Sequence, residues 1–166
     1  INKRKTNIGI LGLGYVGLPL AIRFSEEKFK VVGFDIDVEK VHMLNAGKSF
    51  IKHISEKKIS SIVKAGFTAT DDFGKISDID IILICVPTPL DDHKEPDLSY
   101  VKQTLKTITP YLKGGQLLVL ESTTYPGTTD EEIVPFIEDK GYEIGKNYFI
   151  GYSPEREDPG NKSFTT

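Results

Sequence analysis

A glycine-rich stretch, "GILGLGYVG" at residues 9–17, combines residue types and spacing that could hold a phosphate group. Gly12, Gly14 and Gly17 complete the pattern G-x-G-x-x-G between a strand-like apolar run and a helix-like pattern. In that context the first glycine allows a tight turn, and the second lets backbone N–H groups approach a pyrophosphate. The third lets the helix pack closely on the strand. The sequence therefore predicts an anion site at the N-terminus of a helix.

A carboxylate stands where a dinucleotide-binding loop requires one. Asp35 ends the next apolar run, roughly 20 residues after the glycines, where it can accept hydrogen bonds from ribose hydroxyls. Its negative charge would repel a 2′-phosphate, so NAD is favoured over NADP, although nearby Lys40 leaves room for NADP. The alternative interpretation is a glycine-rich turn followed by an aspartate that caps a helix.

The elements that must position these groups alternate between strand-like and helical patterns. Five apolar runs rich in β-branched residues predict strands at 7–11, 30–35, 79–86, 116–122 and 148–152, and a shorter run indicates a strand at 67–69. The runs are too continuously apolar for a sheet with one wet face, so helices should cover both faces. We expect one α/β domain over residues 1–166, with a doubly wound (Rossmann-like) parallel sheet and helices on both faces.

Helix boundaries can be predicted at two places between these strands. Asp37 can cap a helix that Gly47 ends. Thr129 and Glu132 have the spacing of a capping box, which predicts a second helix start. Pro135 would lie inside that second helix, so we expect a distortion there.

Three further polar segments each follow a predicted strand, namely "CVPTPLDD", "ESTTYPGTT" and "YSPEREDPGN". The carboxyl ends of parallel strands lie on one edge of the sheet, where ligands bind. Each segment alone could be ordinary turn chemistry. Together with the glycine loop and Asp35, they predict a single site.

Composition argues against several classes of function. With 21 basic and 24 acidic side chains the net charge is −3, which favours neither nucleic acid nor an anionic membrane as a partner. The longest apolar run, 81–86, is far shorter than the roughly 20 residues that cross a bilayer, and the start lacks a signal peptide's apolar stretch. We expect a cytoplasmic protein. Cys85 is the single cysteine, and His42, His53 and His93 lack ligand spacing, so no metal site is expected.

The quoted segments also carry a family resemblance. In order and spacing, "GLGYVGLPLA", "CVPTPL", "ESTTYPGTT" and "SPEREDPGN" resemble the nucleotide-sugar 6-dehydrogenases, the UDP-glucose and GDP-mannose dehydrogenase family, over nearly the whole chain. "SPEREDPGN" is most similar to the branch that oxidises UDP-N-acetylhexosamines, in particular UDP-N-acetylglucosamine. Pro159 stands where the UDP-glucose branch has a second glutamate. UDP-glucose, UDP-N-acetylmannosamine and GDP-mannose remain alternatives.

The resemblance implies oxidation of the sugar C6 alcohol to a carboxylate by two NAD⁺, for the synthesis of surface polysaccharide precursors. The family's catalytic cysteine lies in a later motif, and Cys85 does not match it. A lysine and an asparagine of the family site lie in a following helical domain. This chain therefore resembles the amino-terminal NAD-binding domain, without the central helical and carboxy-terminal nucleotide-sugar-binding domains. Alone it is expected to be inactive, whereas the full-length enzyme is expected to be a homo-oligomer.

The resemblance also assigns roles to individual residues. The expected cofactor-binding residues are Gly12, Gly14, Tyr15, Val16, Gly17, Asp35, Lys40, Pro87, Thr88 and Thr123. Thr123 and Glu155 are the expected catalytic residues, with Thr123 near the reacting centre and Glu155 assisting attack of water on a thioester. Glu155 and Arg156 are expected to contact the nucleotide-sugar substrate, although Arg156 could instead pair with neighbouring acids.

Two other classes of function stay open at this stage. A regulatory NAD-sensing module would explain the glycine loop and Asp35, but it would leave "ESTTYPGTT" and "YSPEREDPGN" without a purpose. A hydroxyacid dehydrogenase with a similar amino-terminal fold would perform one two-electron step and would need no thiol. A glycine-flanked cysteine beyond Thr166 would favour the sugar dehydrogenase over both.

Overall fold

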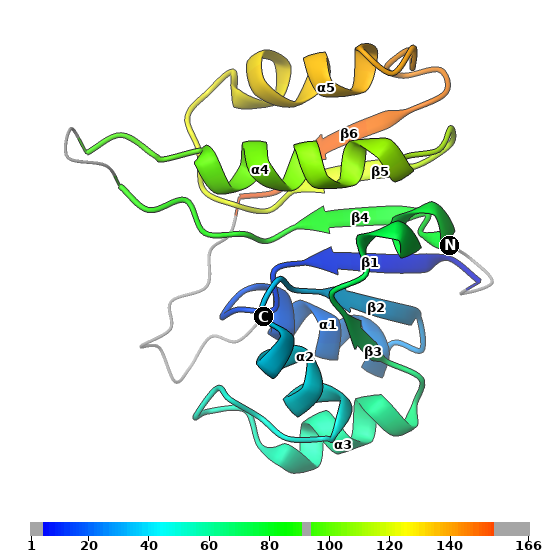
Figure 1. The fold of residues 1–166 in the computed structure, drawn as a ribbon, viewed down its shortest axis with the longest axis vertical. Coiled ribbons are helices and arrows are strands. Elements are labelled where there is room, and N and C mark those ends of the chain that lie inside the picture. Colours follow the sequence, from blue (N-terminus) through cyan, green and yellow to red (C-terminus); the bar gives the residue numbers. More distant parts are fainter. Residues whose placement is uncertain (1–4, 91–93, 155–166) are drawn as a thin grey trace.

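Six parallel strands form one sheet in the computed structural model, which describes residues 5–90 and 94–154. The order across the sheet is β3-β2-β1-β4-β5-β6 (Figure 1). The strands are β1 (Asn7–Leu11), β2 (Lys30–Phe34), β3 (Thr68–Thr70), β4 (Ile81–Ile84), β5 (Leu117–Leu120) and β6 (Phe149–Tyr152). This order starts at β1 and winds outward in both directions, so the predicted doubly wound sheet is confirmed.

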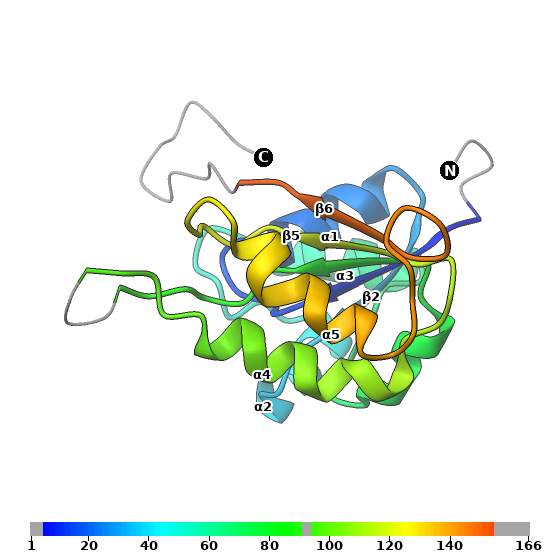
Figure 2. The same ribbon diagram turned by 90° about the horizontal axis from the view of Figure 1, so that it is seen from above.

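Helices cover both faces of the sheet. Figure 2 shows α4 (Ser99–Ile108) and α5 (Val134–Glu138) on the side opposite α1 (Gly17–Glu26). One apolar cluster joins the sheet to α1, α2 (Val38–Asn45) and α3 (Glu56–Lys64), and a second joins it to α4 and α5. Among the described residues, no helix has the length and apolar character needed to cross a membrane.

Asp37 caps α2 as predicted. Its carboxylate accepts hydrogen bonds from the backbone N–H groups of Glu39 (3.1 Å) and Lys40 (3.2 Å). These N–H groups have no partner within the first helical turn, so the carboxylate stabilises the helix start. The helix ends before Gly47, whose φ of 74° is a left-handed conformation that favours glycine.

The predicted capping box is wrong. Thr129–Ile133 form a π-helical turn that precedes α5; its N-cap residue is Thr128, which makes no side-chain capping hydrogen bond. Pro135 explains the wider turn, because it has no N–H to continue an α-helical ladder; the predicted distortion is therefore confirmed. Instead of closing a capping box, the carboxylate of Glu132 forms an ion pair with Lys102 of α4 (2.8 Å).

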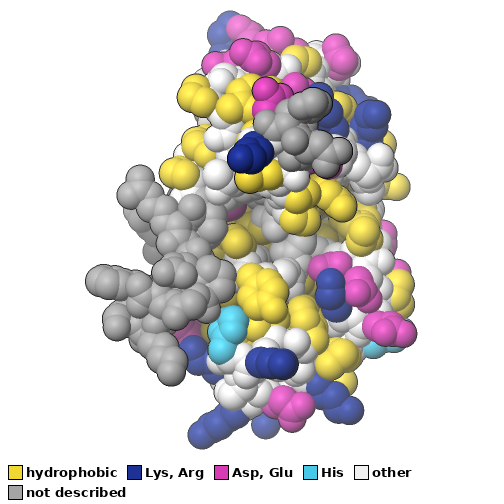
Figure 3. Space-filling view, turned by 90° about the vertical axis from the view of Figure 1, so that its left-hand side faces the viewer, with side chains coloured by type: hydrophobic (Ala, Val, Ile, Leu, Met, Phe, Trp, Pro, Cys, Tyr) yellow, Lys and Arg dark blue, Asp and Glu magenta, His cyan; other side chains and the backbone are white. Residues whose placement is uncertain are grey.

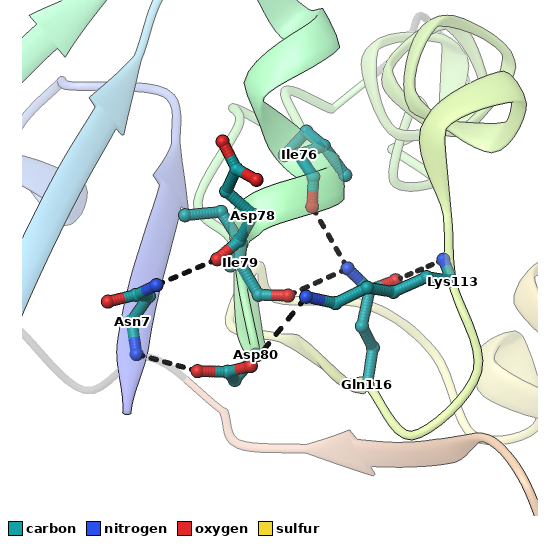
Figure 4. A network of polar contacts seen from close by, with 7 residues as sticks. All are labelled: Asn7, Ile76, Asp78, Ile79, Asp80, Lys113 and Gln116. Atoms are coloured by element: carbon teal, nitrogen blue, oxygen red, sulfur yellow. Dashed lines mark hydrogen bonds and ion pairs between the residues drawn. The ribbon is translucent and has the colours of Figure 1, made fainter. Parts of the chain in front are cut away.

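A buried glutamine holds the amino edge of the sheet, opposite the carboxyl ends of the strands. Gln116 is fully buried, and its side-chain amide donates to the carbonyls of Ile76 (3.0 Å) and Ile79 (2.8 Å) at the end of the 3-10 helix Phe73–Asp78 (Figure 4). Its carbonyl oxygen accepts from the N–H of Lys113 (2.9 Å). The glutamine therefore satisfies loop groups that the strands leave unpaired.

Candidate functional site

A cleft of about 660 Å³ lies at the carboxyl edge of the sheet. Figure 3 looks onto this edge, where the surface is hollowed and apolar side chains surround the hollow. The ends of β1, β2, β4 and β5 and one face of α4 line the cleft. Several polar loops therefore meet at one site, as the sequence predicts.

The fold itself requires two of the three glycines of the loop. Gly12 has a φ of 91°, and a Cβ there would lie 2.9 Å from the carbonyl oxygen of Cys85. A Cβ on Gly17 would lie 1.9 Å from the carbonyl oxygen of Gly12. Side chains at these two positions would disrupt the turn and the packing of α1 against β1.

Gly14 differs from the other two. A Cβ at Gly14 would meet no protein atom within 4 Å, and its backbone is not in the left-handed region. Neither conformation nor packing therefore requires a glycine at this position. The open space lies at the cleft, where a methyl group would occupy the volume that a closely bound ligand needs.

The backbone N–H groups of the glycine loop indicate that a ligand bound there would be negatively charged. The N–H of Gly12 donates to the carbonyl of Phe34 (2.8 Å). By contrast, the N–H groups of residues 14–16 donate to no acceptor in the part of the chain that the structure describes. They precede the 10-residue helix α1, whose dipole places positive potential at this end. Free N–H groups at a helix N-terminus suit a phosphate or pyrophosphate.

Asp35 connects the glycine loop to the start of α2. One carboxylate oxygen accepts from the N–H of Leu13 (2.9 Å), and the other accepts from the N–H of Asp37 (3.0 Å). The side chain is buried at the wall of the cleft. Each carboxylate oxygen can accept a second hydrogen bond, so this position is compatible with a ribose diol.

Lys40 lies beside this acid at the rim of the cleft. Its ammonium group is 3.5 Å from the carboxylate of Asp37 and 5.6 Å from the ring centre of Phe50. The pKa of Asp37 is lowered, first by the hydrogen bond from the backbone N–H of Lys40 and further by the lysine's charge. The lysine therefore places a cation near the predicted ribose position, balanced by Asp37.

Pro87, Thr88 and Thr123 line the other end of the cleft. The hydroxyl of Thr88 donates to the carbonyl of Thr123 (2.7 Å), which joins the loops that follow β4 and β5. The cleft therefore brings together nine of the predicted residues: Gly12, Gly14, Tyr15, Val16, Asp35, Lys40, Pro87, Thr88 and Thr123. Gly17 acts through packing beneath the loop. Glu155 and Arg156 lie outside the described residues.

Sequence reasoning missed several lining residues. Ile36 is 82% exposed at the cleft, and the ring of Tyr15 stacks on His53, with 6.0 Å between ring centres. On α4, four lining residues share one helical face: Tyr100, Gln103, Thr104 and Thr107. Their spacing is that of any solvated helix face, so only the topology of the sheet could have identified them.

The chain was compared with known families and proteins. Residues 6–165 match the model of the UDP-glucose/GDP-mannose dehydrogenase family, NAD binding domain. Protein CapL of Staphylococcus aureus is 39% identical over 160 residues, covering 96% of this chain and 37% of that protein. UDP-N-acetyl-D-glucosamine 6-dehydrogenase of Pseudomonas aeruginosa is 36% identical over 156 residues, covering 93% of this chain and 36% of that protein.

Solved structures give the same result. The structure of UDP-D-ManNAc dehydrogenase from Pyrococcus horikoshii superposes with a TM-score of 0.86 at 33% identity, covering 93% of this chain and 37% of that one. The chain thus spans a little over a third of the length of the relatives that it matches.

Proposed function

Because this chain belongs to the UDP-glucose/GDP-mannose dehydrogenase family and forms its NAD-binding domain, we propose that the cleft at the carboxyl edge is the NAD site. The N–H groups of residues 14–16 bind the pyrophosphate, and Asp35 with Lys40 binds the adenosine ribose. Pro87, Thr88 and Thr123 then face the nicotinamide. NAD supplies the hydride acceptor of the reaction.

The open position at Gly14 is the observation that carries this assignment. Two glycines of the loop are required by the fold, whereas Gly14 leaves space that no protein atom fills. The same loop carries the N–H groups of residues 14–16, which donate to no acceptor within the described residues, and Asp35 accepts from the neighbouring N–H of Leu13. A glycine here is explained by a ligand that approaches the backbone closely.

For the whole enzyme, we propose oxidation of UDP-N-acetylglucosamine at C6 to the carboxylate, in the synthesis of surface polysaccharide precursors. The segment "SPEREDPGN" and the 36% identity to a UDP-N-acetyl-D-glucosamine 6-dehydrogenase support this substrate. Two hydrides leave C6, one to each of two NAD⁺, and water supplies the second carboxylate oxygen. The domains that follow in longer relatives would provide the thiol, lysine, asparagine and nucleotide contacts. A cytoplasmic location and a homo-oligomeric enzyme are part of this proposal.

Two residues of this chain have proposed roles in that reaction. The hydroxyl of Thr123 lies at the predicted nicotinamide end, where it can orient water or donate to developing oxyanion charge. Glu155, which the resemblance identifies as the residue that assists water attack, would accept a proton from that water. Arg156 would bind a sugar substituent or the product carboxylate.

Calorimetry of the 166-residue chain tests the proposed site. We expect NAD⁺ to bind and NADP⁺ to bind more weakly, because the carboxylate of Asp35 repels a 2′-phosphate. Incubation with NAD⁺ and UDP-N-acetylglucosamine should produce no steady supply of reduced cofactor, since the thiol, lysine and asparagine that the resemblance implies are not among these 166 residues. Absence of NAD⁺ binding would refute the site, and steady reduction of NAD⁺ would refute the assignment of missing chemistry.

A further inference from the structure

Ser122 carries a buried hydroxyl that the proposed chemistry does not use. It is 7% exposed, and its Oγ donates to the carbonyl of Val86 at 2.6 Å. Beside it, the hydroxyl of Thr88 donates to the carbonyl of Thr123. Two hydroxyls, one from each loop, therefore cross-link the loops that follow β4 and β5.

These hydrogen bonds begin near the end of the backbone ladder between the two strands. The N–H of Glu121 donates to the carbonyl of Ile84 (2.9 Å), and a parallel ladder advances by two residues, so Val86 carries the next acceptor in register. The hydroxyl of Ser122 satisfies that acceptor. Pro87 follows at once and has no N–H to donate. Side-chain hydroxyls thus extend the rigid pairing into the loops.

The two hydroxyls hold the end of the cleft that faces away from the ribose acid. Asp35 lies beyond β2 on one side of the glycine loop, whereas Thr88 and Thr123 lie beyond β4 and β5 on the other. A dinucleotide with its pyrophosphate at the glycine loop and one ribose at Asp35 must place its second half over these loops.

We propose that Ser122 is a positioning residue for the nicotinamide half of the cofactor, acting with Thr88 through the loop that carries Thr123. This inference rests on the proposed NAD site and adds Ser122, a lining residue of the cleft whose hydroxyl is engaged by the carbonyl of Val86. Without the hydroxyl of Ser122, the carbonyl of Val86 loses this hydrogen bond, and the bond from Thr88 is left to hold the wall at Thr123 to the loop after β4. Binding of the adenosine half, at the far end of the cleft, is unchanged.

The test compares NADH with ADP-ribose, which keeps the adenosine and pyrophosphate but lacks the nicotinamide. NADH is titrated by its fluorescence and ADP-ribose by calorimetry, on the 166-residue wild type, Ser122→Ala and Thr88→Val. We expect both variants to bind NADH about 3- to 10-fold more weakly and ADP-ribose within about twofold of wild type. Thr88→Val changes a less buried side chain and provides the test if Ser122→Ala does not fold.

Ser25→Ala is a matched control. Ser25 is 6% exposed and its hydroxyl also donates to a backbone carbonyl, that of Ala21 at 2.7 Å, but it lies in α1 away from the cleft. This variant should lose a similar hydrogen bond and bind both ligands like wild type.

Equal weakening of NADH and ADP-ribose by Ser122→Ala, or no weakening of NADH, would overturn the positioning role. The same holds if Ser25→Ala shows the same selective loss, or if the wild type binds NADH no better than ADP-ribose. A wild type that binds neither ligand would refute the NAD site itself, so the two failures are distinguishable.

Discussion

Replacement of Gly14 by alanine should leave the stability of the fold intact and weaken the binding of the ligand. The added methyl would meet no protein atom within 4 Å, and the backbone is outside the left-handed region. Gly→Ala at a compatible position stabilises a protein by about 0.4–1 kcal/mol, because the unfolded chain loses freedom. We therefore expect Gly14→Ala to be as stable as the wild type or slightly more stable.

The same methyl should strongly weaken the binding of NAD. Gly14 lines the cleft and belongs to the same loop as the N–H groups of residues 14–16, so on the proposed assignment a methyl there would keep the pyrophosphate from approaching them. Hydrogen bonds to a charged group contribute about 1.5–3 kcal/mol each. Loss of one or two such bonds corresponds to a fall in affinity of roughly 10- to 10⁴-fold.

The assay combines thermal unfolding without ligand and calorimetry with NAD⁺. Gly17→Ala serves as the contrasting variant, because its Cβ would lie 1.9 Å from the carbonyl oxygen of Gly12. That variant should unfold at a lower temperature, whereas Gly14→Ala should not. If Gly14→Ala binds NAD⁺ like the wild type, or unfolds like Gly17→Ala, the assignment of the open space to the pyrophosphate is wrong.

Four other perturbations probe separate parts of the molecule. Asp35→Ala should weaken NAD⁺ binding by about 1–3 kcal/mol and NADP⁺ binding less, by calorimetry, and should also lower the melting temperature because two backbone N–H groups lose their acceptor. Gln116→Leu should reduce the free energy of unfolding by about 1–3 kcal/mol in urea titrations, since the carbonyls of Ile76 and Ile79 and the N–H of Lys113 lose the hydrogen bonds of this amide; an unchanged value would contradict its role. The lowered pKa of Asp37 means that its contribution to stability is full above its ordinary pKa of about 3.9 and is lost as pH falls through the lower folded value. Asp37→Asn keeps the helix cap, so its unfolding free energy should change less with pH below that value, and a slope equal to that of wild type would count against the linkage. In a full-length enzyme, Glu155→Gln should keep the first hydride transfer, seen as a burst of reduced cofactor, and slow the steady rate by about 10² to 10⁴; loss of the burst would instead indicate substrate positioning.

The sequence predicted the presence of the strands correctly but not the residues at which they end. Continuous apolar runs placed β4 and β5 correctly, but the predicted ranges 79–86 and 116–122 are longer than Ile81–Ile84 and Leu117–Leu120. The extra residues at the ends of these ranges include polar ones, and two of them, Gln116 and Ser122, use their side chains for loop carbonyls. Which partner a polar side chain finds depends on tertiary contacts, and a local pattern does not contain that information.

Among the site residues, too, those with a local sequence signal were predictable and those placed by tertiary contacts were not. Gly12, Gly14 and Asp35 were predictable because their spacing reports a local strand–turn–helix unit. Glu132 was assigned to a helix cap and instead pairs with Lys102 of another helix, a long-range contact that a local spacing does not contain. The face of α4 that lines the cleft has no signature of its own, since its contribution depends on the position of β4 in the sheet.

The sheet consists of two halves, each built from a consecutive stretch of chain, and the pairing of β1 with β4 joins them. β1, β2 and β3 come from the first stretch and β4, β5 and β6 from the second, and the junction joins groups as distant as Asn7 and Asp80, 73 positions apart. Closing this junction costs more chain entropy than forming either half, so it should form late during folding. The cleft lies across the junction, with Asp35 on one half and Thr123 on the other. A dinucleotide bound there would connect the two halves, and amide hydrogen exchange along the β1–β4 ladder would slow when it binds.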